Sequence, residues 1–228
     1  MPEGSPTPPD YSLYPGYVQK IRRVLIRWGK KNYRPFPWRT PAEPWEGLIA
    51  EILLQRTKAD SVVPVYHNFI ARFSTPEKLS RASVTSIEKV IYPLGLRWRA
   101  PLLKALGKEL AHRNGEIPLD LDQLRTLPGV GTYVAAAWLG FHGGRRAFIV
   151  DANVVRLFCR LVAAPADGET RRKKWLISLA DQLTPQKTWK VYNYAILDFT
   201  MQICRKKPAC SLCPLNTLCP FPAEHIYE

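Results

Sequence analysis

The chain has 228 residues, and its 33 Lys and Arg against 19 Asp and Glu give a formal net charge of +14 at pH 7. Such a charge attracts phosphates and favours a nucleic acid as partner, although a basic surface that only aids solubility gives the same balance. The 46% of hydrophobic and 11% of aromatic residues exclude a largely disordered basic tail. The sequence contains neither a membrane-spanning apolar run nor a signal-peptide pattern, so we expect an intracellular protein of the cytoplasm or nucleoid without membrane contact.

The predicted elements of the chain are almost all helices. Residues 1–16 contain five prolines and are expected to form a flexible leader. Apolar residues at helical spacing predict a first helix over 17–30, and prolines then interrupt regular structure up to residue 44. Further helices are predicted over 46–57, 60–72, 76–80, 83–91, 98–113, 120–126, 132–142, 152–163, 171–183 and 187–203. Because strand-like alternation is almost absent and the connections are short, the predicted fold class is all-α.

A glycine-containing turn separates two of these helices, at Leu127-Pro128-Gly129-Val130-Gly131. Two glycines one residue apart allow a tight turn, and the amides that open the next helix can receive a phosphate. A helix-hairpin-helix of this kind grips the DNA backbone without reading sequence. An ordinary turn between helices can also contain glycine, but the whole LPGVG pattern in so basic a chain favours DNA binding.

Two carboxylates are candidates for chemistry. Asp151 opens the helix predicted after the apolar run 147–150, where an N-cap is its ordinary role. A carboxylate held at a helix start can also stabilise positive charge that develops on a sugar. Glu51 lies in the apolar stretch AEILLQRT, with Gln55 four residues later on the same predicted helical face. Glu51 is either a solvated residue of an amphipathic helix or a buried acid with a partner or a function.

Four of the five cysteines lie within sixteen residues near the C-terminus. Cys204, Cys210, Cys213 and Cys219 have the spacing C-x5-C-x2-C-x5-C. Four thiolates on a short loop can hold a zinc ion or a [4Fe-4S] cluster, and the spacing leaves both open. Cys159 stands among apolar residues of a predicted helix and is expected to be a buried side chain rather than a ligand.

Together these motifs resemble the endonuclease III and adenine-glycosylase superfamily of helix-hairpin-helix (HhH-GPD) DNA glycosylases. The elements PWRTP, EILLQRT, LGLRWRA, LPGVG, VDANVVR and the four-cysteine loop follow in the family's order, from about Pro37 to Cys219. The resemblance implies two helical domains with a DNA-binding cleft: 36–147 with the hairpin, and 17–35 plus 148–228 with the cysteine loop. It also implies a [4Fe-4S] cluster, although the spacing from Cys204 to Cys210 is one residue shorter than usual. The implied partner is double-stranded DNA with a mismatched or damaged base, bound by a monomer.

The resemblance assigns roles to individual residues. Asp151 would stabilise an oxocarbenium-like transition state and direct water. Glu51 would act in the base pocket, protonating or orienting the base or positioning water, and Tyr133 would line that pocket. At the opened duplex, Gln55 would fill the gap left by the flipped base and Arg56 would contact the opposite base. Trp98 would be either a wedge in the strand or a core residue. The DNA backbone would be contacted by the hairpin residues Leu127, Gly129, Val130 and Gly131 and by the basic Arg205, Lys206 and Lys207.

Position 133 separates the reactions found in this family. Bifunctional relatives carry a lysine there, and a tyrosine cannot form a Schiff base with the sugar. We therefore expect a monofunctional DNA glycosylase of base excision repair, with at most weak strand cleavage. Tyr133 after LPGVG, combined with EILLQRT, is most similar to the thymine-DNA glycosylases that remove T or U opposite G by base flipping.

Three other functions stay open on the sequence. An adenine glycosylase acting on A opposite 8-oxoguanine or G shares both carboxylates and the cysteines. Such enzymes usually carry a further C-terminal domain, whereas nine residues follow Cys219. A non-catalytic DNA-binding module with a structural metal would use the hairpin but release no base. An iron-sulfur redox protein would leave the hairpin and the basic surface without a purpose.

Overall fold

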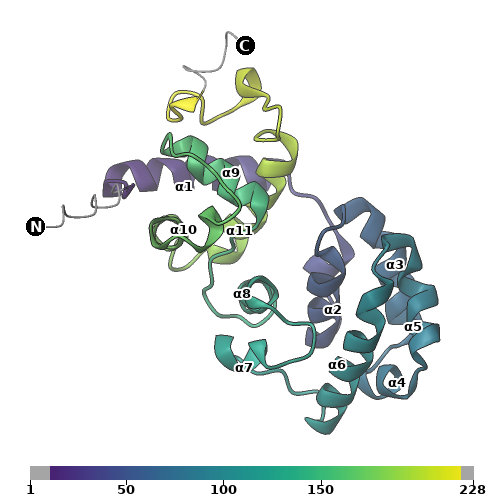
Figure 1. Ribbon diagram of the computed structural model, residues 1–228. Coiled ribbons are helices and arrows are strands. Elements are labelled where there is room, and N and C mark those ends of the chain that lie inside the picture. The colour runs from purple at the N-terminus through teal and green to yellow at the C-terminus, as the bar shows by residue number, and fades with distance from the viewer. Residues whose placement is uncertain (1–10, 222–228) are drawn as a thin grey trace, which may run out of the picture. The chain divides into compact units, whose positions relative to one another are not determined.

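The computed structural model describes residues 11–221 (Figure 1). Every regular element in this range is a helix and no strand occurs within it, which confirms the predicted all-α class. The chain divides into two compact units: unit 1 comprises Met1–Arg34 and Phe148–Glu228, and unit 2 comprises Pro35–Ala147. No helix of the described range is both long and apolar enough to cross a membrane.

Unit 2 is a cluster of helices around one apolar core. α6 packs against α4 and α5, while α2 packs against α3 and α8. The core includes Leu48 of α2, Phe69 of α3, Leu106 of α6 and Trp138 of α8, all of which are buried. The helices are α2 (Pro44–Leu54), α3 (Ala59–Arg72), α4 (Pro76–Arg81), α5 (Val84–Ile91), α6 (Ala100–His112), α7 (Leu121–Arg125) and α8 (Thr132–Phe141), with the short 3-10 turns η1 (Pro37–Arg39), η2 (Tyr92–Leu94) and η3 (Arg97–Arg99).

Polar side chains define several helix starts in unit 2. The Thr75 and Ser83 hydroxyls accept hydrogen bonds from backbone N–H groups in the first turns of α4 and α5. Asp120 caps α7 in the same way, since its Oδ1 accepts from the N–H of Gln123 at 3.0 Å. Each cap satisfies a donor that has no partner inside the helix. The caps explain why the predicted starts of these helices are close to the observed ones.

Within its described residues, unit 1 contains four longer helices, α1 (Pro15–Lys31), α9 (Ala152–Leu161), α10 (Lys174–Leu183) and α11 (Trp189–Gln202), and the turns η4 (Thr170–Arg172) and η5 (Cys210–Leu212). α1 lies along α11, and α9 packs against both α10 and α11 (Figure 1). The buried faces are apolar and include Leu25 of α1, Phe158 of α9 and Phe199 of α11. The start of α9 and the segment after α11 are therefore held on the same helical framework.

The N-terminal leader differs from the prediction in its last residues. α1 begins at Pro15, two residues earlier than expected, because proline fits the first turn of a helix, where its missing N–H has no partner to lose. The backbone N–H of Leu13 donates to Gln182 Oε1 of α10 at 3.1 Å, and the Gln182 amide donates back to the carbonyl of Leu13. A flexible leader is thus wrong for residues 13–16, while residues 1–10 lie outside the described range.

Candidate active site and cysteine loop

Asp151 is the N-cap of α9, which confirms its predicted capping role. Its Oδ1 accepts hydrogen bonds from the backbone N–H groups of Asn153 at 2.9 Å and Val154 at 2.7 Å. Its Oδ2 accepts from the side-chain amide of Asn153 at 3.0 Å. These three hydrogen bonds hold both oxygens of the half-buried carboxylate in a fixed orientation. The carboxylate therefore lies beside the partial positive charge of a helix N-terminus.

A chain of hydrogen bonds runs from Asp151 to the first cysteine of the loop. Asn153 Oδ1 accepts from the guanidinium of Arg156 at 3.0 Å. Arg156 in turn donates to the carbonyl of Cys204 at 2.8 and 3.0 Å and to the carbonyl of Thr200 at 3.1 Å. Burial lowers the pKa of the Arg156 guanidinium. The residues of VDANVVR therefore connect the candidate catalytic carboxylate with the cysteine loop inside one unit.

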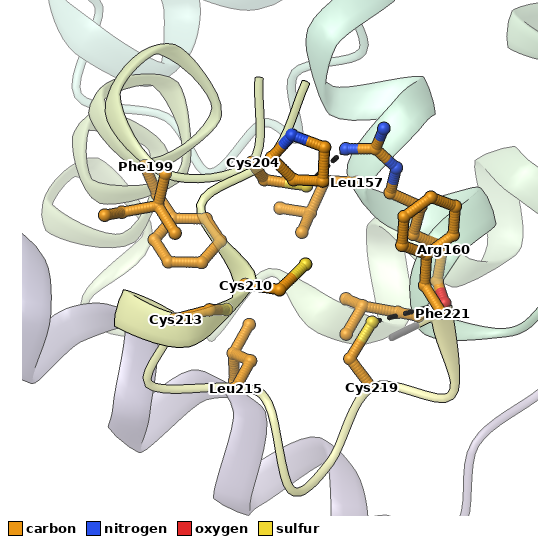
Figure 2. Close-up of a pocket in the computed structure, with 12 residues that line it drawn as sticks. Leu157, Arg160, Phe199, Cys204, Cys210, Cys213, Leu215, Cys219 and Phe221 are labelled. Atoms are coloured by element: carbon orange, nitrogen blue, oxygen red, sulfur yellow. Dashed lines mark hydrogen bonds between the residues drawn. The ribbon is translucent and has the colours of Figure 1, made fainter. Parts of the chain in front are cut away.

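The four clustered cysteines line a single cavity that is partly open to solvent (Figure 2). Leu157 of α9, Phe199 of α11 and Leu215 form apolar parts of its wall. Cys204, Cys210, Cys213 and Cys219 all carry free thiols. Within residues 11–221 no three His, Cys, Asp or Glu side chains lie close enough to hold one metal ion. The thiols thus surround a space instead of meeting at one point.

Arg160 of α9 forms hydrogen bonds with both ends of the cysteine loop. Its guanidinium donates to Cys204 Sγ at 3.3 Å, to the carbonyl of Arg205 at 2.7 Å and to the carbonyl of Lys206 at 3.0 Å. The Cys219 thiol donates to the carbonyl of Arg160 at 3.4 Å. Burial, with a smaller contribution from the neighbouring cysteines, raises the pKa of Cys219 to about 11. The side chains of Arg205 and Lys206 stay exposed, because only their carbonyls turn toward Arg160.

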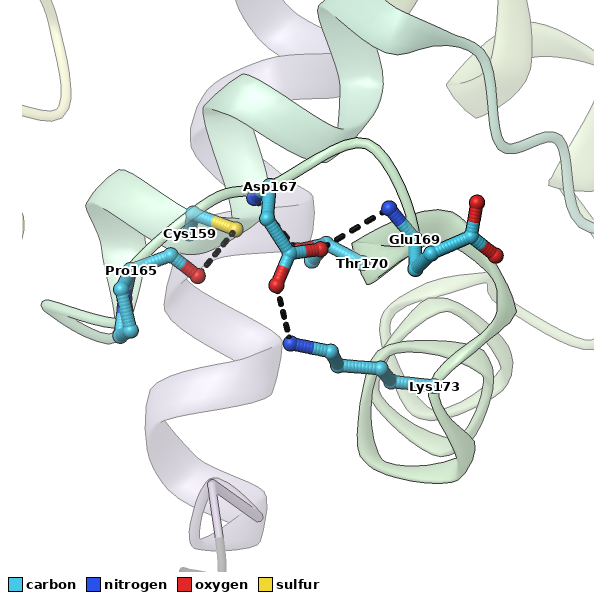
Figure 3. A network of polar contacts seen from close by, with 6 residues as sticks. All are labelled: Cys159, Pro165, Asp167, Glu169, Thr170 and Lys173. Atoms are coloured by element: carbon cyan, nitrogen blue, oxygen red, sulfur yellow. Dashed lines mark hydrogen bonds and ion pairs between the residues drawn. The ribbon is translucent and has the colours of Figure 1, made fainter.

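Cys159, the fifth cysteine, is buried as predicted, with 3% of its surface exposed. Its thiol donates a long hydrogen bond of 3.9 Å to the carbonyl of Pro165 (Figure 3). The turn that follows is held by Asp167, whose carboxylate accepts from the buried Thr170 hydroxyl at 2.8 Å and from Lys173 Nζ at 2.6 Å. These bonds lower the pKa of Asp167 from 3.8 to about 2, with Lys173 as the largest cause.

We expect this Asp167 network to make stability depend on pH only at the acid end. A lowered pKa adds stability above pH 3.8, and this stability is lost as the pH falls toward about 2. Asp167→Asn keeps an acceptor for Thr170 but loses the charge opposite Lys173. The melting temperature of the variant should therefore be lower than that of wild type near neutral pH, and the two should converge in acid. A difference that is the same at every pH, or as large in Glu169→Gln of the neighbouring exposed ion pair, would contradict this role.

Glu51 is buried inside unit 2, which decides between the two alternatives left open by the sequence. Only 3% of its surface is exposed, and it lies on α2 among core residues. Its Oε1 is 3.6 Å from Nε2 of His142, the residue that directly follows α8. No periodicity or motif singled out His142, so the sequence analysis missed this neighbour.

The segment after Glu51 departs from the prediction. α2 ends at Leu54 and not at residue 57, and Gln55 has an extended backbone, so Gln55 does not share a helical face with Glu51. Arg56 adopts a left-handed conformation with φ of 62°, which is uncommon for a residue with a side chain. The buried guanidinium of Arg99 ends the helix here, donating to the carbonyl of Ile52 at 2.6 Å and to that of Gln55 at 3.1 Å.

Trp98 and the hairpin expose different parts to solvent. Trp98 is 60% exposed, so it is not the core residue that the sequence allowed as an alternative. The side chains of Leu127 and Val130 are buried in the core, so at these two positions only the backbone is available for the expected DNA contacts. Gly129 has a φ of 79°, a conformation that favours glycine. The hairpin can therefore contact a partner mainly through its backbone. Tyr133 of α8 is partly buried and packs against the core of unit 2.

The chain belongs to the HhH-GPD superfamily of base excision DNA repair proteins, whose family model matches residues 49–178, more than half of its length. The matched range contains the second half of α2 with Glu51, the hairpin and α9 with its cap. This confirms the family that the motifs indicated, and with it the predicted class of enzyme, a DNA glycosylase.

Particular relatives lie within this superfamily. The chain is 38% identical to a thymine/uracil-DNA glycosylase of Pyrobaculum aerophilum over 89% of this chain and 91% of the relative. It is 36% identical to a thymine-DNA glycosylase of Aeropyrum pernix over 90% and 95% of the two chains. Among solved structures, a thermostable thymine-DNA glycosylase matches with a TM-score of 0.85 and 31% identity, covering 92% of this chain and 98% of the other. An endonuclease III–DNA complex matches with a TM-score of 0.80 and 26% identity, covering 95% and 100%.

Proposed function

We propose that this protein removes thymine or uracil opposite guanine from double-stranded DNA and leaves an abasic site. The observation that carries this proposal is that the chain has both a fixed carboxylate at Asp151 and a tyrosine at position 133, where a lysine would allow strand cleavage. The names of the relatives similar along most of the chain support the same reaction. A mismatched base costs less free energy to flip out than a correctly paired one, so the enzyme reaches a base in a wobble pair more easily.

In this reaction the two carboxylates have separate tasks. The bond between the sugar and the flipped base breaks, and positive charge develops on the sugar. The base leaves with the bonding electron pair, and the Asp151 carboxylate stabilises the charge on the sugar and directs the water that then adds to it. The proton that this water loses neutralises the departed base. Glu51 lies in the base pocket, where it orients the base or water, and Tyr133 lines the same pocket. Gln55, Arg56 and Trp98 contact the opened duplex, and the hairpin backbone at Gly129 and Gly131 receives a phosphate.

Base release from matched duplexes tests this proposal. We expect the purified protein to release T or U from G·T and G·U pairs, with strand breaks that appear only after alkali. Duplexes containing A·8-oxoguanine and undamaged pairs serve as controls. Release of A would assign the chain to the adenine glycosylases, breaks without alkali would contradict the role of Tyr133, and no release at all would favour a binding module.

We also infer that Cys204, Cys210, Cys213 and Cys219 hold a [4Fe-4S] cluster. A single zinc ion with Zn–S bonds of about 2.3 Å needs its four sulfur atoms within about 4 Å of one another. The four thiols line one cavity, and within the described residues no three of them lie close enough to share one ion, which suits a cluster of several atoms better than a single zinc ion. The Arg160 guanidinium beside Cys204 Sγ supplies positive charge next to a thiolate ligand. When bound, the cluster would fix the loop that presents Arg205, Lys206 and Lys207.

Metal analysis of the purified protein distinguishes the two metals. We expect iron and inorganic sulfide in equal amounts, about four of each per chain, with visible absorption that is lost on oxidation. Zinc in a ratio of one per chain, in a colourless protein, would contradict the cluster. The protein should be purified without oxygen, because an exposed cluster can be lost before it is measured.

A further inference from the structure

We propose that His142 is a positioning residue for Glu51, which its imidazole Nε2–H holds in one orientation. This inference rests on the proposed role of Glu51 in the base pocket and adds a residue to it. The two side chains belong to the same unit, because Glu51 lies on α2 and His142 directly follows α8, the helix that begins at the hairpin. The proposal therefore depends only on the packing inside unit 2.

Both side chains are almost completely removed from solvent. The His142 side chain is 2% exposed and the Glu51 side chain 4% exposed, and Nε2 lies 3.6 Å from Oε1. The Nε2 atom has no hydrogen-bond partner within the described part of the chain. A buried polar nitrogen without a partner is costly, and the Glu51 carboxylate is an acceptor 3.6 Å away. The separation is slightly too long for a hydrogen bond, as is common for catalytic groups before substrate binds.

A glycine in α2 makes room for the imidazole. A Cβ placed on Gly47 would lie 2.6 Å from Cγ and Nδ1 of His142 and 2.8 Å from its Cδ2. Glycine inside a helix costs about 1 kcal/mol relative to alanine, so helix stability alone disfavours it at this position. The ring lies against the helix backbone at Gly47, one turn before Glu51, and its Nε2 is 3.6 Å from the carboxylate. Gly47, Glu51 and His142 thus form one packed arrangement, which we call the α2 triad.

The α2 triad is better explained by function than by stability. A buried polar pair contributes little compared with apolar side chains of the same volume. A carboxylate that acts on a flipped base, however, must be held close to its productive orientation by neighbours that are themselves fixed. His142 is fixed by packing on Gly47, and its backbone N–H donates to the carbonyl of Trp138 at 2.8 Å. An N–H donor at Oε1 leaves the other oxygen of Glu51 free to face the base.

Single-turnover base release from a G·U duplex tests the proposal, with the affinity for an uncleavable duplex measured separately. We expect His142→Leu to lower the rate about ten- to hundredfold while the affinity changes less than about twofold. His142→Gln carries an amide N–H near the position of Nε2 and should recover most of the rate. An unchanged rate in His142→Leu, or a Gln variant as slow as the Leu variant, would overturn the proposal.

A double-mutant cycle separates positioning from general structural damage. If His142 acts through Glu51, then His142→Leu should cost less than about twofold in a Glu51→Gln background. The same fold loss in both backgrounds would assign His142 a merely structural role. If wild type releases T and U but Glu51→Gln is fully active, the assigned role of Glu51 has failed. If wild type releases neither base, the proposed function itself has failed.

A spectroscopic measurement keeps the proposal testable without any activity. In protein labelled with ¹⁵N-histidine, the His142 signals are identified by their loss in His142→Leu. We expect its Nε2 to carry a proton and its resonance to shift when Glu51 is replaced by Gln. A ring whose Nε2 signal does not respond to Glu51→Gln would contradict the contact.

Gly47→Ala offers a second route to the same result, because it leaves both polar side chains in place. The new methyl group must displace the ring from Glu51, so we expect a loss of rate similar to that of His142→Leu. Gly107→Ala is the matched control, since a Cβ on this buried glycine of α6 would lie 2.8 Å from Cγ of Leu79. Equal rate losses in the two alanine variants would indicate general packing damage and overturn the role of the α2 triad.

Discussion

Asp151→Asn should lower single-turnover base release at least about hundredfold while leaving the fold and DNA affinity nearly unchanged. Asn is as good an N-cap as Asp, and its carbonyl oxygen can accept the bonds that Asn153 and Val154 now donate to Oδ1. The substitution therefore removes charge while it keeps the cap. The measurement is the release rate on a G·U duplex, together with the melting temperature and the affinity for an uncleavable duplex.

The matched control for Asp151→Asn is Asp120→Asn, which removes the same charge from the N-cap of α7. Asp120 accepts from Asp122 and Gln123 as Asp151 accepts from Asn153 and Val154, but we propose no chemistry for it. It should retain its full rate. If both variants keep wild-type rates, Asp151 is only a helix cap, and its proposed role in stabilising the charge on the sugar is wrong.

The sequence predicted most helices because local signals fixed them. The caps at Thr75, Ser83, Asp120 and Asp151 and the apolar spacing of each helix are all readable in order along the chain. The errors occur where a distant residue decides. α2 stops at Leu54 because Arg99, far along the chain, donates to the carbonyls at its C-terminal end. No pattern within α2 carries that information.

The site residues that were predicted have local signals in the sequence, whereas the missed ones depend on contacts formed in the fold. Asp151, Glu51 and the cysteines are conspicuous because their types are rare in apolar or short segments. His142 is inconspicuous in the sequence, and its importance follows only from the packing of α2 against α8. Arg156 and Asn153 could have been found, since their spacing of three residues puts both on one face of the helix that Asp151 opens.

Arg156→Met should impair both Asp151 and the cysteine loop. The guanidinium is partly buried and makes three hydrogen bonds to backbone carbonyls, so its loss should lower the free energy of unfolding by about 3 kcal/mol. Without these bonds, the carbonyls of Cys204 and Thr200 lose their donor and the side chain of Asn153 loses the partner that orients it. We expect lower iron content and lower base release in the same variant, measured on protein purified without oxygen.

Two neighbouring variants separate these effects of Arg156. Asn153→Ala breaks the chain between Asp151 and Arg156 but leaves the bonds to Cys204 in place, so iron should be retained while base release falls. Arg160→Met releases the carbonyls of Arg205 and Lys206 and leaves Asn153 in place, so iron should be lost. If Asn153→Ala loses iron as readily as Arg156→Met, the helix start and not the guanidinium supports the loop. If Asn153→Ala keeps its full rate, the orientation of Asp151 is set by the backbone N–H groups of α9 alone.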